Sequence, residues 1–179
     1  MNTDEISPFF VFISSSQEEF ANLRKELKDA IDNEEFRVSH SRPMKAVLIE
    51  QKRGDVIPED IGRELDRCSI YVGIFGRILS KWTIAECREA RVKGLPLLIY
   101  YVKRRKPGRP SRKPRGRKSK VEEALESEVK RFGIRVRGPF WKEGELYDVI
   151  LEDLAYEIVE LVSEATSIRK LIHKSVSPP

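Results

Sequence analysis

The sequence predicts an α/β fold built around a five-stranded parallel sheet. Short runs of apolar and aromatic residues, typical of strands covered on both faces, alternate with longer segments that carry apolar residues at helical spacing. The clearest of these apolar runs are 9–13, 70–75 and 97–102. Because neighbouring parallel strands need a crossover between them, this alternation predicts helices on both faces of the sheet.

Serines join the first predicted strand to the first predicted helix. Residues 9–13 (FFVFI) are followed directly by Ser14, Ser15 and Ser16, and Ser16 with Glu19 has the pattern of a helix capping box. The helix that follows carries one apolar stripe, formed by Phe20, Leu23, Leu27 and Ile31. Such a turn directs N–H groups and hydroxyls toward a ligand above the sheet. The alternative is that the serines only cap the helix.

The middle of the chain is expected to supply a second and a third strand. Residues 36–39 are predicted to form a short strand, and residues 43–55 a long loop of the kind that often carries function. Pro58 is predicted to open the next helix, because proline is favoured at the first helical position. The third strand, 70–75, ends at Gly76.

The stretch that follows holds a helix, its stop signal and the fourth strand. Residues 83–93 are predicted to be helical, with Thr83 as the N-cap and Glu86 completing a capping box. Gly94 then ends the helix and strand 97–102 follows. Glu86 is therefore expected in the first turn of a helix that follows a parallel strand, at the edge where ligands bind.

The C-terminal part is expected to add one strand and two helices. We predict a helix over 121–132, a fifth strand within 134–141 and a long helix over 145–165. The long helix has one apolar stripe, formed by Leu146, Ile150, Leu154, Ile158, Leu161 and Ala165. Right-handed crossovers between five strands favour a flavodoxin-like three-layer sandwich with strand order 2-1-3-4-5.

The predicted domain spans residues 9–166, with flexible ends at 1–8 and 167–179. Segment 103–120 contains eleven of the 34 Lys and Arg residues and no acid, which leaves 23 basic against 29 acidic residues elsewhere. Its prolines and glycines predict a disordered insertion in an otherwise acidic domain.

Composition argues against several classes of protein. No apolar run is long enough to span a membrane and the first residues lack the layout of a secretory signal, so we expect a cytoplasmic location. Cys68 and Cys87 fall within helical patterns as buried free thiols, and no metal-ligand spacing is present. The many charged residues and the scarcity of Asn and Gln favour a thermophilic source.

Three stretches resemble an uncharacterised domain family whose members begin with F-I-S-S-T. They are F-V-F-I-S-S-S-Q-E-E-F, I-Y-V-G-I-F-G and T-I-A-E-C-R-E-A-R-V-K-G-L-P-L-L-I-Y, and the resemblance extends from Phe9 to Ala165 without the basic insertion. That family is similar to the TIR domains and the nucleoside deoxyribosyltransferases. The resemblance implies a TIR-like fold that binds a nucleotide, NAD or a nucleoside at the C-terminal edge of its sheet, in signalling or defence.

The resemblance also implies a catalytic residue. In the enzymatic relatives a glutamate in the motif T-x-x-E-x-x-x-A attacks or stabilises the anomeric carbon of a ribosyl group, and by position this residue is Glu86. N-glycosidic cleavage passes through an oxocarbenium-like state, which a carboxylate stabilises. In addition, Arg77 could clamp a phosphate and Glu50 could reach a ribose hydroxyl. The expected ligand-binding residues are Ser14, Ser15, Ser16, Gly76, Arg77, Thr83 and Glu50. The alternative is that Glu86 only caps its helix.

The basic segment supports a different hypothesis. Its P-G-R-P and P-R-G-R-K stretches resemble the AT-hook, whose extended core lies in the narrow minor groove of A/T-rich DNA. The residues expected to contact nucleic acid are Arg104, Arg105, Arg109, Arg112, Arg115 and Arg117. A solvated loop, or one that docks on an acidic face of a second copy in a homodimer, is the alternative. A third hypothesis is a non-catalytic module that uses the fold for assembly.

Overall fold

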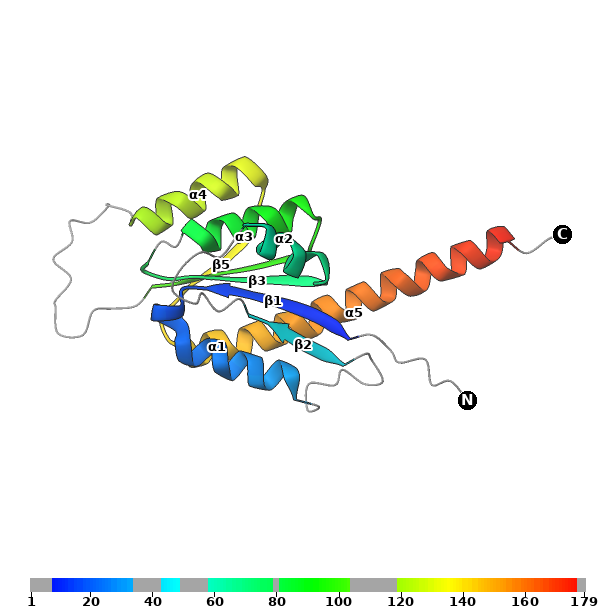
Figure 1. The fold of residues 1–179 in the computed structure, drawn as a ribbon, viewed down its shortest axis with the longest axis horizontal. Helices are drawn as coiled ribbons and strands as arrows, with labels where there is room; N and C mark the ends of the chain where they lie inside the picture. The colour runs from blue at the N-terminus through cyan, green and yellow to red at the C-terminus, as the bar shows by residue number, and fades with distance from the viewer. Residues whose placement is uncertain (1–7, 34–42, 49–57, 79–80, 104–118, 177–179) are drawn as a thin grey trace.

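Five parallel strands form one sheet with the order β2-β1-β3-β4-β5. The computed structural model describes residues 8–33, 43–48, 58–78, 81–103 and 119–176, and it places helices on both faces of this sheet (Figure 1). The strands are β1 (Phe9–Ser15), β2 (Met44–Val47), β3 (Ile70–Phe75), β4 (Leu97–Val102) and β5 (Val136–Phe140). The helices are α1 (Gln17–Asp32), α2 (Pro58–Asp66), α3 (Lys81–Val92), α4 (Lys120–Phe132) and α5 (Glu143–Val176). The predicted fold class and strand order are confirmed.

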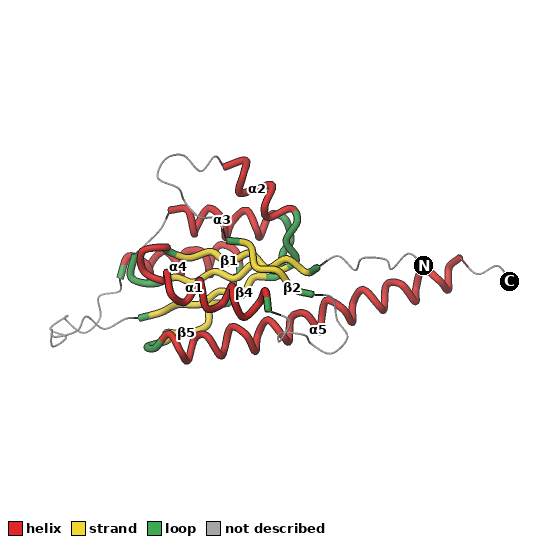
Figure 2. The backbone as a smooth tube through the Cα atoms, turned by 60° about the horizontal axis from the view of Figure 1, so that its bottom comes forward, coloured by secondary structure: helices red, strands yellow, loops and turns green. Residues whose placement is uncertain are grey.

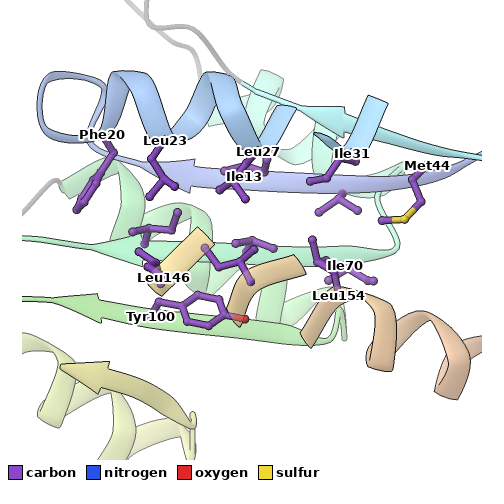
Figure 3. Close-up of a cluster of buried hydrophobic side chains, with 14 of the residues drawn as sticks. Ile13, Phe20, Leu23, Leu27, Ile31, Met44, Ile70, Tyr100, Leu146 and Leu154 are labelled. Carbon is purple, nitrogen blue, oxygen red and sulfur yellow. The ribbon is translucent and has the colours of Figure 1, made fainter. Parts of the chain in front are cut away.

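Alternate residues of the central strands enter two separate cores. Ile13 of β1 and Ile70 of β3 belong to the core that α1 and α5 cover, which also takes in Leu23, Leu27 and Leu154 (Figure 3). Phe12 and Tyr71, one position along each strand, belong to the core under α2, α3 and α4. Since successive side chains of a strand point to opposite faces, the continuous apolar runs of the sequence are explained by burial on both sides.

The second strand differs from the prediction. β2 is Met44–Val47, which lies within the predicted loop 43–55, whereas the predicted strand 36–39 lies outside the described residues. β2 pairs in parallel with β1, and the backbone N–H of Ala46 donates to the Asp32 carboxylate at 2.7 Å. The prediction of a loop over these four residues is wrong. An edge strand of four residues carries too few apolar residues to be recognised as a strand from the sequence.

The first strand extends further than predicted. Ser14 pairs with Gly73 and Ser15 with Ile74, so β1 includes two of the three serines. The predicted turn is thereby reduced to Ser16, whose hydroxyl accepts a hydrogen bond from the Glu19 backbone N–H at 3.3 Å. Because Ser14 belongs to a strand and not to a turn, its side chain points directly to one face of the sheet.

Two helices also extend beyond their predicted ends. α3 begins at Lys81, so Thr83 is inside the helix and is not its N-cap. It ends as predicted before Gly94, whose positive φ of 74° suits a residue without a side chain. α5 continues to Val176 through a segment that was predicted to be a flexible tail. None of the helices in the described part of the chain has the length and apolar character needed to cross a membrane.

Candidate functional site

The central feature of the candidate site is a contact between Ser14 and Glu86, which are 72 positions apart in the sequence. The Ser14 hydroxyl donates a hydrogen bond to Oε2 of Glu86. Both side chains are shielded from water, with exposed fractions of 1% for Ser14 and 7% for Glu86. The structure therefore brings together two residues that were expected to meet at the carboxyl edge of the sheet.

Glu86 reaches Ser14 because it lies on the buried face of α3. Thr83, Cys87 and Ala90 are buried on the same helix at the spacing of one helical face. The predicted capping box between Thr83 and Glu86 is wrong, since α3 begins two residues before Thr83. The Thr83 backbone carbonyl instead accepts a hydrogen bond from the Tyr71 hydroxyl at 3.2 Å. The Glu86 carboxylate is thus turned toward the sheet, where its partner is Ser14.

Burial dominates the electrostatics of this site. It raises the pKa of the Glu86 carboxyl, and the hydrogen bond from Ser14 and the positive charge of Arg24 act in the opposite direction. Burial also raises the pKa of Tyr71, and the nearby Cys87 and Glu86 add to this effect. Tyr71 is therefore a neutral hydrogen-bonding group, and the net effect on Glu86 is a carboxyl pKa above its ordinary value. Carboxyl groups with perturbed pKa values are common at functional sites.

Arg24 of α1 is a site residue that the sequence analysis missed. Its side chain is buried, and Nη1 donates to both the backbone carbonyl and the hydroxyl of Ser15 at 3.2 Å each. It thereby holds the residue next to Ser14 and supplies a positive charge that favours ionised Glu86. A signal was present in the sequence, because Arg24 stands four residues after Phe20 and next to Leu23, on the apolar stripe of the helix.

Replacing Arg24 with methionine should raise the pKa of Glu86 further, because the substitution removes a positive charge that favours the carboxylate. An NMR titration of the glutamate side-chain carboxyl carbons would measure this shift. Lys25→Met provides a matched control, since Lys25 is the exposed neighbour on the same helix. Equal titration curves in the two variants would contradict the assigned influence of Arg24.

Glu19 is the second buried acid near this edge, and its side chain does not complete the predicted capping box. Its two carboxylate oxygens accept hydrogen bonds from the backbone N–H groups of Arg77 at 2.8 Å and Ile78 at 2.9 Å. It thereby fastens the segment that follows β3 to the first turn of α1. Gly76 allows this approach, because a Cβ atom there would lie 2.5 Å from the Glu19 carboxyl carbon.

Some of the other residues predicted to bind ligand or nucleic acid are described by the structure, and others are not. Ser16 caps α1, and Gly76 is buried beside Glu19. Arg77 is exposed and takes part in the described site through its backbone N–H. Glu50 and the arginines of the basic segment lie outside the described residues. Their roles with ligand and nucleic acid therefore stay predictions from the sequence, as does the disorder of residues 104–118. The ends of the predicted insertion are ordered, since Lys103 pairs with Glu122 and Ser119 caps α4.

Other chemistry is sparse in the described part of the chain. Cys68 and Cys87 are free and buried, as predicted, and burial raises the pKa of each thiol to about 12. Cys87 also lines a cavity of about 10 Å³ between α3 and α4, which has room for no more than a water molecule. Within the described ranges, no group of three His, Cys, Asp or Glu side chains is arranged to hold a metal ion.

One family model matches the chain, and the match covers most of the α/β fold. Residues 10–155 match the model of a family described as Domain of unknown function (DUF4062). The matched residues run from β1 into α5, and they include Ser14, Arg24 and Glu86. No curated protein matches the chain.

Proposed function

The chain belongs to this family of domains of unknown function, and we propose that it is a TIR-like domain that binds a nucleotide, NAD or a nucleoside and cleaves its N-glycosidic bond. The observation that supports this proposal best is the buried contact between the Ser14 hydroxyl and the Glu86 carboxylate. The contact lies where β1 ends, at the edge of a parallel sheet at which ligands generally bind. The match between the motif around Glu86 and that of the ribosyl-cleaving relatives supports the same assignment.

The proposed reaction breaks the bond between the anomeric carbon of the ribosyl group and a nitrogen of the base. The base leaves with the bonding electron pair, and positive charge develops on the ribosyl ring. Ionised Glu86 stabilises that charge or attacks the anomeric carbon. Water then supplies the oxygen of the new C–O bond and releases one proton. Ser14 orients the carboxylate, and Arg24 favours the ionised form that this step requires.

The proposal can be tested by incubating the protein with NAD, and separately with purine and pyrimidine nucleosides, and separating the products by chromatography. With NAD as substrate, we expect nicotinamide and ADP-ribose to appear in equal amounts. A bound ligand should also raise the thermal unfolding temperature, because saturation at 100 times Kd stabilises a fold by about 2.7 kcal/mol. Neither base release nor a shift in unfolding temperature with any of these compounds would contradict the proposal.

A further inference from the structure

Tyr71 of β3 is a buried side chain at the candidate site to which the proposed reaction gives no role. Its exposed fraction is 0%, and its hydroxyl donates a hydrogen bond to the backbone carbonyl of Thr83 at 3.2 Å. Thr83 stands one helical turn before Glu86 on α3, which covers the face of the sheet opposite to α5 (Figure 2). The Tyr71 hydroxyl therefore lies beneath the part of α3 that carries Glu86.

The absence of a side chain at Gly73 lets the Tyr71 ring reach this position. A Cβ atom at Gly73 would lie 2.9 Å from Cε1 of Tyr71, so the ring fills the space that a side chain there would need. The Phe12 ring stacks on it, with 5.8 Å between the ring centroids. Ser14 is the residue of β1 that pairs with Gly73. The Tyr71 ring therefore extends along β3 to the level of Ser14.

The Ser14 hydroxyl has two acceptors within reach. Its single proton is donated to Oε2 of Glu86. The second acceptor is the oxygen of Tyr71, which still has lone pairs available because its own proton goes to the Thr83 carbonyl. Burial raises the pKa of Tyr71, whereas a hydrogen bond from Ser14 acts in the opposite direction. Ser14 can donate to only one of the two acceptors at a time.

The charge of Glu86 decides which acceptor is the better one. A hydrogen bond to an ionised group is about twice as strong as one between neutral groups, so the carboxylate is preferred while it is ionised. Protonation, or a covalent bond to the ribosyl carbon, removes that charge. Ser14 is 1% exposed, so bulk water cannot replace a lost acceptor. Leaving a buried donor unpaired corresponds to a factor of about 5 to 150 in an equilibrium constant.

We propose that Tyr71 is a positioning residue that takes over the Ser14 hydrogen bond when Glu86 loses its negative charge. The Ser14 hydroxyl rotates from Oε2 of Glu86 to the oxygen of Tyr71, and each hydroxyl keeps its own proton. Tyr71 thereby stabilises the protonated and the covalently bonded states of Glu86 relative to the ionised state. The consequence for catalysis rests on the proposed function, whereas the change of acceptor needs no substrate.

An NMR titration of the Glu86 side-chain carboxyl carbon tests the change of acceptor directly, and the signal is identified by its absence from Glu86→Gln. In Tyr71→Phe the protonated state of Glu86 loses the second acceptor for Ser14, so the pKa of Glu86 should be lower than in the unaltered protein. In Ser14→Ala that pKa should rise, because the hydrogen bond that lowers it is removed. Adding Tyr71→Phe to Ser14→Ala should then change nothing, because no hydroxyl is left to transfer.

Tyr100→Phe is the matched control for this titration. Tyr100 is also 0% exposed, and its hydroxyl donates to Asp153 at 2.7 Å in the core on the other face of the sheet. This variant should leave the pKa of Glu86 unchanged, and circular dichroism should show that all the variants are folded. A raised or unchanged pKa of Glu86 in Tyr71→Phe would overturn the proposal. The same shift in the presence and absence of the Ser14 hydroxyl would also overturn it, because a role limited to holding the Thr83 carbonyl does not depend on Ser14.

The kinetics of base release separate this inference from the proposed reaction. Tyr71→Phe should lower kcat by about fivefold or more and change KM by less than about twofold, because the hydroxyl acts while Glu86 bonds to the ribosyl carbon. The rate should fall although more of Glu86 is ionised. An undiminished kcat in Tyr71→Phe would overturn the role of Tyr71 in catalysis. Absence of base release from the unaltered protein would contradict the proposed function, and the titrations would still decide whether Ser14 changes its acceptor.

Discussion

Glutamine in place of Glu86 should slow base release by at least two orders of magnitude, about 10²-fold or more, while leaving the protein folded. The amide has the shape of the carboxyl group and can still accept the Ser14 hydrogen bond. However, it cannot carry the negative charge that stabilises a ribosyl cation, and it cannot act as a nucleophile or base. Losing a group of this kind reduces turnover by about 10²-fold to 10⁴-fold. The measurement is the rate of nicotinamide or nucleobase release at saturating substrate.

The same substitution should make the protein more stable at neutral pH. Burial raises the pKa of Glu86 in the folded state above its ordinary value of 4.5, so the folded state binds more protons than the unfolded state between the two values. The stabilising contribution of Glu86 is therefore complete below the unfolded pKa and is lost as pH rises through the folded pKa. Glutamine does not titrate, so the gain should be largest at neutral pH and should shrink toward pH 4.5. Urea unfolding at a series of pH values would measure it.

Glu89→Gln is the matched control for both measurements. Glu89 lies on the same helix, and 44% of its side chain is exposed. This variant should keep both the activity and the pH dependence of stability of the unaltered protein. Full activity in Glu86→Gln would contradict a catalytic role for Glu86 and would favour the non-catalytic module. Unchanged stability in Glu86→Gln would contradict the effect of burial.

The fold was predictable because two of the three inner strands, β3 and β4, carry strong local signals. Ile70–Phe75 and Leu97–Val102 were predicted to the residue, since each is a continuous apolar run with Gly or Pro close by. The meeting of Ser14 and Glu86 was predictable from topology alone, because parallel strands end at the same edge of their sheet. β2 was not predictable, since an edge strand of four residues has no such run.

The partners of individual acids could not be predicted from local pattern. Glu19 and Glu86 both occupy the fourth position of a capping box in the sequence, yet both side chains bond to groups far along the chain. A capping box offers a carboxylate one backbone N–H, whereas Glu19 gains two in the folded protein. For Glu19 the tertiary partner therefore displaces the local bond, whereas Glu86 loses its local partner because α3 begins two residues before Thr83.

Alanine in place of Glu19 should lower the free energy of unfolding by about 3 kcal/mol or more. The substitution leaves the backbone N–H groups of Arg77 and Ile78 without their carboxylate, and a hydrogen bond to a charged group contributes about 1.5–3 kcal/mol. The effect should appear as a lower midpoint in urea unfolding. Glu18→Ala is the matched control, because Glu18 is the exposed neighbour in the same turn of α1. An equal loss in both variants would contradict the assigned role of Glu19.

Gly76→Ala should reveal how closely the segment after β3 is fitted to Glu19. The added Cβ would lie 2.5 Å from the Glu19 carboxyl carbon and 2.6 Å from the Phe20 ring, so something must shift. Crowding of this kind costs about 1–3 kcal/mol. In the Glu19→Ala background the cost should fall but not vanish, since the Phe20 ring remains. A double-mutant cycle should therefore give a coupling energy above about 0.5 kcal/mol, whereas strictly additive losses would show that Gly76 and Glu19 act independently.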